Sequence, residues 1–410
     1  MRWGGESATW DELLDRGRER SALVAPQRAY RVDPAAGLES LVSLFAVATV
    51  ADTVLLWSSG PGGRELAPGL AEADLPVDGP LERPLWGVAT SGSTGNAKLA
   101  IGHADSWESI ALHYERSLYG DCSADGMPPV LATCLPLQFS ASFFMTVLPS
   151  LFLRRDLLVF PAHDWSAAHA EAAERDIAVL AVPALAAAAC LTMDRQVDAS
   201  RITLFLGGGH LGAERVRMVR ERFSGVSVRN LYGTAETGAV AVDQDPGHNQ
   251  HVGVPVAGKA VWLEGTDPDG IGAVAVAGPD CCLGTWRPGE ALRRNGGYVA
   301  STDYGRFDAE GRLCLEGRVD GGEKLHGVLV YPRAVERHLL ALPGVADAKV
   351  AIHRADTGLE HLVARVVGSA SADDVREHCA ALPEAERPSR VECVPEELAL
   401  AAYSPNGKLS

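Results

Sequence analysis

A stretch rich in hydroxyl groups and glycines carries the residue types that bind phosphate. It reads Thr90-Ser91-Gly92-Ser93-Thr94-Gly95-Asn96-Ala97-Lys98 and follows an apolar run, 85–89, that predicts a short strand. Glycines allow positive φ and a close approach of the backbone to a ligand, so N–H groups, hydroxyls and one lysine could surround phosphate oxygens. The stretch is not a Walker loop, because Ala97 stands where that pattern needs its second glycine. By composition alone, a flexible surface loop would look the same.

A second stretch combines an aromatic ring with a carboxylate at the end of a predicted strand. Tyr232-Gly233-Thr234-Ala235-Glu236 follows the strand predicted over 226–230, and α/β sheets collect ligands at the carboxyl ends of their strands. The ring of Tyr232 could stack on adenine, and the carboxylate of Glu236 could hold Mg²⁺ that bridges phosphates. An ordinary turn with a solvated glutamate is the alternative for this stretch taken alone.

Four motifs in the same order resemble those of the adenylate-forming (AMP-binding) superfamily, which includes acyl-CoA synthetases, nonribosomal-peptide adenylation domains and luciferases. Besides the two stretches above, they are Thr302-Asp303 through Gly317-Arg318-Val319-Asp320, and Pro405-Asn406-Gly407-Lys408. Together they span residues 85–410. The chain departs from the family at Ala97, where proline is usual, and at Ala235, where threonine is common. The region before the phosphate loop is shorter than is usual in the family, so a reduced N-terminal subdomain is expected.

The resemblance implies ATP and Mg²⁺ as ligands and gives several residues a role. Tyr232 would stack on adenine, and Asp303 and Arg318 would bind the ribose. Glu236 would bind the metal, and Lys98 would contact the phosphates; both are predicted to be catalytic, together with Lys408. Lys408 would stabilise the charge that develops as the acyl adenylate forms. The other residues predicted to bind the nucleotide are Thr90, Ser91, Gly92, Ser93, Thr94, Gly95, Gly208, Gly209, Gly233 and Thr234.

The acyl pocket is predicted from a difference between this chain and its amino-acid-activating relatives. Those relatives place an aspartate after a phenylalanine to bind the α-ammonium group, and Ser140 falls at that position after Phe139. A buried ammonium without a counter-charge is costly. We therefore expect an aryl or short acyl acid without an α-amine. The predicted pocket residues, each of which could equally be core packing, are Phe139, Ser140, Phe144, Gly208 and Gly238.

A glycine-rich turn supports a rival function, that of an NAD(P)-dependent oxidoreductase. Gly207-Gly208-Gly209-His210-Leu211-Gly212 fits the dinucleotide-binding pattern Gly-x-Gly-x-x-Gly, after a predicted strand and before a predicted helix. The acidic residue expected at the end of the next strand is missing, because Arg229 and Asn230 stand there. In the adenylate-forming family, a glycine-rich turn at this place lines the adenine and acyl pockets.

The order of predicted elements favours a layered α/β fold. Strands and helices alternate over 99–231, which is typical of a mostly parallel sheet covered by helices. Short strands and turns predict a small β-rich subdomain over 251–317. By the resemblance, 1–319 would be a large adenylating domain and 320–410 a small mobile α+β domain, with a hinge at Asp320. The Pro- and Gly-rich segment 60–84 is expected to be poorly structured.

Composition narrows the partners and the compartment. The net charge of −16 argues against a nucleic-acid or anionic-membrane surface. The apolar runs 41–57 and 177–193 are interrupted by Asp52 and Pro183, so they predict core elements rather than membrane spans. The scattered cysteines show no Cys-x-x-Cys pattern and no secretory leader opens the chain, which favours the cytoplasm.

The sequence therefore predicts a two-step ligase. ATP and a carboxylic acid would give acyl-AMP and pyrophosphate, and a thiol would then displace AMP. The thiol could be CoA or the phosphopantetheine of an acyl or peptidyl carrier protein. A catalytically lapsed relative that still binds the acyl group or the nucleotide is the further alternative.

Overall fold

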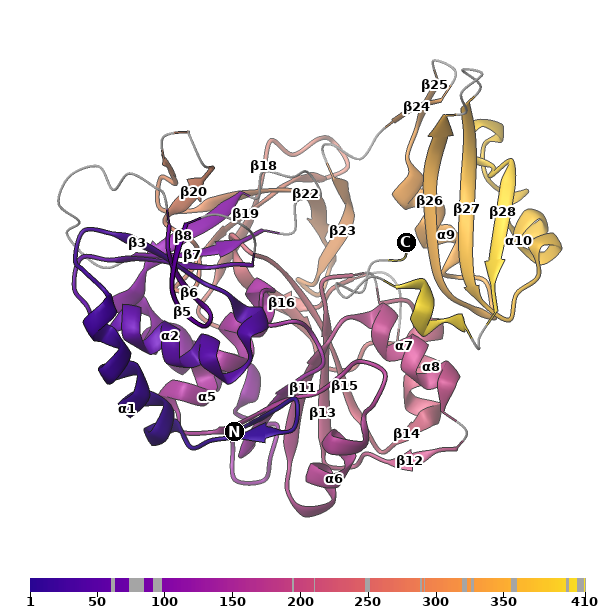
Figure 1. Cartoon of the computed structure of the whole chain (residues 1–410). Coiled ribbons are helices and arrows are strands. Elements are labelled where there is room, and N and C mark those ends of the chain that lie inside the picture. Colours follow the sequence, from indigo (N-terminus) through magenta and orange to yellow (C-terminus); the bar gives the residue numbers. More distant parts are fainter. Residues whose placement is uncertain are drawn as a thin grey trace.

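The computed structural model describes residues 1–59, 63–73, 85–90, 98–193, 195–209, 211–247, 251–287, 290, 292–318, 323–325, 328–354, 360–395, 398–403 and 409. Two large sheets and their helices form the main body, and a smaller three-stranded sheet lies beside it (Figure 1). The predicted α/β class is confirmed.

The larger sheet has nine strands in the order β17-β16-β15-β13-β11-β9-β10-β1-β2. From β15 to β1 neighbouring strands pair in parallel, whereas β16, β17 and β2 join antiparallel. The strands are β1 Arg2–Trp3, β2 Glu6–Ser7, β9 Val130–Thr133, β10 Asp156–Val159, β11 Ile177–Ala181, β13 Ile202–Gly207, β15 Ser227–Thr234, β16 Gly238–Asp243 and β17 Val254–Pro255. The helices in this part are α3 Trp107–Tyr114, α4 Ser140–Ser142, α5 Leu148–Phe152, α6 Ser166–Glu174, α7 Pro183–Thr192 and α8 Ala213–Arg222.

A second sheet has eight strands in the order β21-β20-β8-β7-β4-β3-β6-β5. Only β3, β4 and β7 pair in parallel there, so antiparallel pairing is more common than the sequence predicted. The strands are β3 Ala29–Val32, β4 Val54–Trp57, β5 Arg64–Ala67, β6 Leu70–Glu72, β7 Leu85–Ala89, β8 Leu99–His103, β20 Gly284–Trp286 and β21 Arg293–Arg294. Helices α1 Trp10–Arg20 and α2 Leu38–Ala48 belong to the same N-terminal part.

One expectation for this region was wrong. The segment 60–84 was expected to be poorly structured, but its residues 64–72 form the hairpin of β5 and β6, which pairs with β3. Gly69 has a φ of +72°, the left-handed conformation that glycine adopts without strain in a tight turn. The glycines and prolines that suggested an irregular connection therefore include the turn of a regular hairpin.

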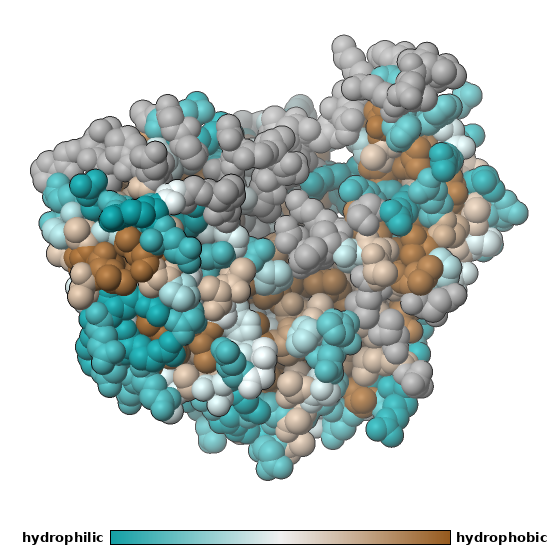
Figure 2. All heavy atoms as spheres, in the orientation of Figure 1, coloured by the Kyte–Doolittle hydropathy of each residue, from teal (hydrophilic) through white to brown (hydrophobic). Residues whose placement is uncertain are grey.

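Aromatic side chains fill the core of the main body. Trp57 lies 4.9 Å from Phe143 between ring centroids, and Trp86 lies 4.9 Å from Phe144. The indole of Trp57 donates a hydrogen bond of 2.5 Å to the carbonyl of Leu137, so its N–H is satisfied while the ring is buried. These contacts join the eight-stranded sheet to the segment that follows β9. The outer face of α1 is mainly hydrophilic (Figure 2), as expected for an amphipathic surface helix.

The predicted β-rich region contains a four-stranded antiparallel sheet in the order β18-β19-β22-β23. Its strands are β18 Ala260–Glu264, β19 Gly272–Ala277, β22 Val299–Phe307 and β23 Leu313–Arg318. A short parallel pair, β12 Val197–Asp198 with β14 Phe223–Ser224, lies elsewhere in the main body.

The C-terminal part is a three-stranded sheet with two helices, preceded by a short hairpin. Its elements are β24 Glu323–Leu325, β25 Val328–Val330, α9 Pro332–Leu339, β26 Val345–Arg354, β27 Glu360–Gly368, α10 Ala372–Cys379 and β28 Arg390–Val394. Asp320 lies outside the described residues. The hinge, the domain boundary and the movement of this part therefore stay predictions.

Two sets of contacts attach the C-terminal part to the main body, one beside α7 and α8 (Figure 1) and one at β23. Arg215 of α8 donates to the carbonyl of Ala346 at 2.5 Å and forms a buried ion pair with Asp347. Arg337 of α9 donates to the carbonyls of Leu315 and Glu316 of β23, both at 3.1 Å. An apolar cluster adds to the first contact and consists of Ala188, Val367, Val394, Ala399, Ala402 and Leu409. Among the described residues, the structure has no helix with the length and apolar character needed to cross a membrane.

Candidate active site

The predicted phosphate loop begins and ends on two paired strands, β7 and β8. β7 and β8 pair antiparallel from Leu85 with His103 to Ala89 with Leu99. The N–H of Thr90 then donates to the carbonyl of Lys98 at 2.9 Å. The loop between them, Ser91 to Ala97, lies outside the described residues, and with it the predicted ligands Ser91, Gly92, Ser93, Thr94 and Gly95.

Lys98 and Glu236 form an ion pair that joins the two large sheets. Lys98 directly precedes β8 of the eight-stranded sheet, and Glu236 lies in the turn after β15 of the nine-stranded sheet. Both side chains are partly exposed, so each remains open to a ligand. The structure thus brings together two residues that the sequence predicted to act on the phosphates and the metal.

The turn that carries Glu236 is held by two threonines. The hydroxyls of Thr234 and Thr237 lie 3.0 Å apart. The N–H of Thr234 donates to the Thr237 hydroxyl at 3.0 Å, and the N–H of Thr237 donates to the Thr234 hydroxyl at 3.2 Å. Gly238 ends the turn with a φ of +62°. The backbone that presents Glu236 is therefore fixed by reciprocal bonds across the turn.

Tyr232 and Asp303 also meet, although they come from different sheets. The phenol of Tyr232 donates to Oδ2 of Asp303 at 2.8 Å. The hydroxyl of Ser301 contacts the same oxygen at 3.2 Å and accepts from the N–H of Asp303 at 3.0 Å. Asp303 pairs with Arg318 in the register of β22 and β23, so the backbones of both predicted ribose-binding residues are neighbours. The side chain of Arg318 is not among those described.

The predicted pocket residues fall into different environments. Phe144 is buried against Trp86, and Gly238 packs against Asp280. Phe139 and Ser140 are partly exposed at the start of α4. Gly208 and Gly209 are exposed after β13, beside Val182 and Pro183. Their role in an acyl pocket stays a prediction, as does that of Lys408, which lies outside the described residues.

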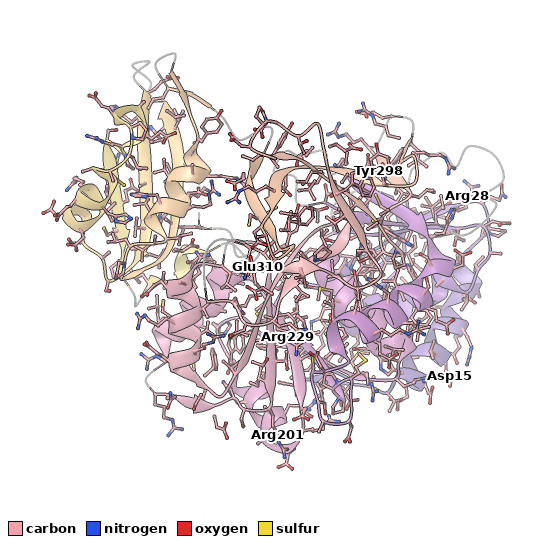
Figure 3. The ribbon with its side chains drawn as sticks, turned by 180° about the vertical axis from the view of Figure 1, so that it is seen from behind. Asp15, Arg28, Arg201, Arg229, Tyr298 and Glu310 are labelled. Carbon is pink, nitrogen blue, oxygen red and sulfur yellow. The ribbon has the colours of Figure 1, made fainter. Side chains whose placement is uncertain are left out.

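The glycine-rich turn after β13 lacks the acidic partner of a dinucleotide site. Arg229 and Asn230, which stand where that acid was expected, are buried within β15. Arg229 donates to Asp121 at 2.7 Å and to the carbonyl of Leu118 at 3.1 Å, and it lies inside the main body, away from the surface position of Arg201 (Figure 3). Arg229 therefore ties β15 to the segment after α3, a structural role.

Three polar residues with buried side chains lie behind the turn and were not predicted from the sequence. Lys259 and Asp280 form an ion pair, and the phenol of Tyr114 donates to Asp280 at 2.7 Å. Burial, together with the Asp280 carboxylate, raises the pKa of Tyr114 well above its usual value, so the phenol stays protonated and can donate. Nothing in the sequence marks this set, because its members lie in α3, before β18 and after β19.

The carboxylates of the candidate site could hold Mg²⁺ only together with the phosphates of a bound nucleotide. Among the described residues, no group of three or more His, Cys, Asp or Glu side chains could hold a metal ion by itself. Protein-bound Mg²⁺ usually keeps several waters and is held by one or two carboxylates plus substrate phosphates. A single partly exposed carboxylate, Glu236, next to the base of a candidate phosphate loop meets that requirement.

Comparisons with known proteins agree on one family. The model of the AMP-binding enzyme family matches residues 21–286, a range that includes the glycine-rich turn after β13. Feruloyl-CoA synthase from Amycolatopsis sp is 28% identical over 73% of this chain and 63% of that protein. Indoleacetate–CoA ligase from Aromatoleum aromaticum is 29% identical over 71% of this chain and 58% of that protein. The chain thus spans less than two thirds of the length of these relatives.

A peptide synthase and two solved structures are also similar. Isonitrile lipopeptide synthase from Streptomyces coeruleorubidus is 34% identical over 46% of this chain, which corresponds to 14% of that protein. ATP-bound MatB from Rhodopseudomonas palustris has a TM-score of 0.70 at 20% identity and covers 95% of this chain and 90% of its own. The anthranilate CoA ligase AuaEII in complex with anthranoyl-AMP has a TM-score of 0.71 at 18% identity, with 97% and 90% covered. These structures share the fold.

The turn around Gly238 yields a test of its packing. A Cβ at Gly238 would lie 2.1 Å from Oδ2 of Asp280, so Gly238→Ala must displace a buried carboxylate. Gly270 has a similar φ, +76°, but nothing lies within 4 Å of its Cβ position, which makes Gly270→Ala the matched control. We expect Gly238→Ala to lower the free energy of unfolding by about 2 kcal/mol more than the control, the middle of the range for overpacking. Equal losses in urea unfolding of the two variants would contradict this packing.

Proposed function

Because the chain belongs to the AMP-binding enzyme family, we propose that it is an ATP-dependent acid–thiol ligase that forms an acyl adenylate. Two contacts around one turn support the proposal. Lys98 forms an ion pair with Glu236, and Tyr232 donates a hydrogen bond to Asp303. Three segments far apart in the sequence supply these residues. A bound nucleotide requires a cation, a carboxylate that binds a metal, an aromatic ring and a hydrogen-bond acceptor for its ribose, and these residues supply those groups.

The chain's own residues position the nucleotide and balance its charge. Asp303 has two carboxylate oxygens that can accept from ribose hydroxyls, and the Tyr232 phenol keeps that carboxylate oriented at 2.8 Å. Glu236 and Lys98 neutralise each other without a ligand. With ATP bound, Lys98 would hold phosphate oxygens and Glu236 would hold Mg²⁺, which would supply charge neutralisation at the phosphates.

Both chemical steps are displacements that depend on position and charge. In the first, a carboxylate oxygen of the acid attacks the α-phosphorus and pyrophosphate leaves. In the second, a thiolate attacks the acyl carbonyl carbon and AMP leaves. Holding the reactants in line and stabilising developing charge supply most of the acceleration in such reactions, so a protein nucleophile is not needed.

The acid is proposed to be an aryl or short acyl carboxylic acid without an α-amine. Ser140 offers no charge to an ammonium group, and it begins α4, which directly precedes the core residues Phe143 and Phe144. The names of similar proteins point the same way, because feruloyl-CoA synthase and indoleacetate–CoA ligase are named for aryl acids. The thiol is CoA by likeness to these two, or a carrier-protein phosphopantetheine by likeness to the lipopeptide synthase.

The function is tested by pyrophosphate release with ATP and Mg²⁺ across a panel of carboxylic acids, α-amino acids included. Hydroxylamine traps the acyl adenylate as a hydroxamate. We expect release and hydroxamate with an aryl or short acyl acid and neither product with α-amino acids. CoA and a phosphopantetheinylated carrier protein are then offered in parallel to identify the acceptor. Silence across a broad panel would contradict the ligase and favour a catalytically lapsed relative, and NADP⁺ binding by the same sample would favour an oxidoreductase.

Removal of Lys408 should separate chemistry from binding. We expect Lys408→Ala to lower hydroxamate formation on the order of 100-fold, the typical effect of losing one charge-stabilising donor. ATP affinity, measured by calorimetry, should change little because the proposed contacts of the ATP are made by Tyr232, Asp303 and Lys98. Lys408→Arg keeps the charge and should retain more activity than the alanine variant. Wild-type hydroxamate formation by Lys408→Ala would remove this lysine from the mechanism.

A carboxylate at position 140 tests the acid specificity. Ser140→Asp would face an anionic substrate with a like charge, and such juxtaposition costs several kcal/mol in a desolvated site. We expect the KM for the preferred acid to rise by about tenfold or more, which corresponds to at least 1.4 kcal/mol. Ser140→Ala, which changes size but not charge, should stay near the wild type. An unchanged KM in the aspartate variant would place position 140 away from the acyl carboxylate.

A further inference from the structure

A fully buried ion pair lies directly behind the turn that presents Glu236. Lys259, which precedes β18, pairs with Asp280, which follows β19, and their side chains are 0% and 1% exposed. Removing two charges from water costs several kcal/mol per ion, and a well-packed apolar pair is often as stable or more stable. The contribution of this pair to stability therefore does not explain its presence, and its contacts indicate another role.

Each charge of the pair binds the backbone of the turn. The ammonium of Lys259 donates to the carbonyl of Thr237. Oδ2 of Asp280 accepts from the N–H of Ala239 at 3.0 Å. The two bonds hold the peptide groups on either side of Gly238, whose Cα packs against the same carboxylate. The pair thus fixes the side of the turn that follows Glu236.

The segment after Asp280 binds Glu236 itself. The N–H of Cys282 donates to the carbonyl of Glu236 at 2.8 Å. Tyr114 of α3 donates to Oδ2 of Asp280 at 2.7 Å and connects that segment to the main body. A displacement of Asp280 would therefore move both the backbone of Glu236 and the carbonyl that Lys259 binds.

We propose that Lys259 and Asp280 are positioning residues for Glu236 and set the affinity of the site for the metal that accompanies ATP. The inference rests on the proposed function, because it assigns Glu236 to that metal. Lys259 and Asp280 act only through the backbone of the turn. Their loss should weaken the metal's contribution to ATP binding and leave the binding of the nucleotide alone unchanged.

The test compares the affinity for ATP with Mn²⁺ and with EDTA by calorimetry, since Mn²⁺ prefers the same oxygen ligands as Mg²⁺. The ratio of the two affinities reports the metal's contribution. Lys259→Met/Asp280→Asn removes both charges and keeps an acceptor for Ala239 and Tyr114. We expect its ratio to fall about tenfold while the affinity in EDTA stays within about threefold, since loss of a positioning shell typically reduces metal affinity 10- to 100-fold.

Arg229→Met is the matched control. Arg229 lies on β15, the same strand that ends in the turn, and its buried side chain pairs with the exposed carboxylate of Asp121. Its loss should lower the melting temperature without changing the ratio, because its contacts are with Asp121 and Leu118, away from Glu236. A fall in the ratio equal to that of the double variant would contradict a specific role for Lys259 and Asp280.

Tyr114→Phe provides a second route if the double variant does not fold. It removes one hydrogen bond to Asp280 and no charge, and we expect the ratio to fall two- to fivefold, as for the loss of about 0.5–1 kcal/mol. Wild-type ratios in the folded variants would overturn the positioning role alone. A wild-type protein that binds ATP no better with Mn²⁺ than with EDTA would instead contradict the metal site of the proposed function, and the positioning role with it.

Discussion

The packing of the two large sheets against one aromatic core is the constraint on which the candidate site depends. Lys98 precedes a strand of the eight-stranded sheet, and Glu236 follows a strand of the nine-stranded sheet. Their ion pair can form only if both sheets keep one relative position. Trp57 and Trp86 from one sheet, packed on Phe143 and Phe144, hold that position. Because protein cores are as dense as organic crystals, side chains of this size leave little freedom for the sheets to slide.

The loop and the turn of the candidate site are each attached to strands of the packed sheets. The hydroxyl-rich loop begins and ends on a β-hairpin, and Glu236 sits in a turn closed by Thr234 and Thr237. Asp303 lies in the middle of β22 and forms the end pair of its register with β23, opposite Arg318. Sites built on strands and helices hold side chains more precisely than sites built on loops. Among the described residues proposed to bind the nucleotide, Glu236 and Asp303 are therefore held in place by regular elements of the main body.

Residue types and the local order of elements made much of the fold and of the candidate site predictable. The pairing of strands that are distant in the sequence could not be predicted. The α/β class followed from strands and helices that alternate, and the motifs around Lys98, Tyr232 and Asp303 followed from a family resemblance. The hairpin of β5 and β6 was missed because its turn glycine looked like irregular chain. The antiparallel pairs of the eight-stranded sheet were missed because local sequence does not encode which distant strand becomes a neighbour.

The buried pair of Lys259 and Asp280 is a second contact, within the site, that the sequence did not predict. A lysine next to a turn and an aspartate after a proline are usually solvated, and only the fold reveals that both are buried. Their positions in the sequence gave no periodic or motif signal. By contrast, Ser140 could be singled out because the family resemblance supplied a charged residue for comparison. The sequence therefore named candidate residues where a motif existed and named none where two isolated charges met through tertiary structure.

Two buried ion pairs of the described structure, Lys259 with Asp280 and Arg215 with Asp347, differ in the cost of separating their charges. Breaking the first inside a folded body leaves charges in a low dielectric, which is strongly unfavourable. The second joins α8 to β26, two elements on either side of the predicted hinge. If the C-terminal part rotates, as the family resemblance predicts, Arg215 and Asp347 separate into water and regain their hydration. A charged contact is then easier to open than an apolar one of the same area, because hydration offsets the lost attraction. If that rotation occurs, the pair at α8 would form a reversible contact, whereas the pair near the turn would stay in a fixed position.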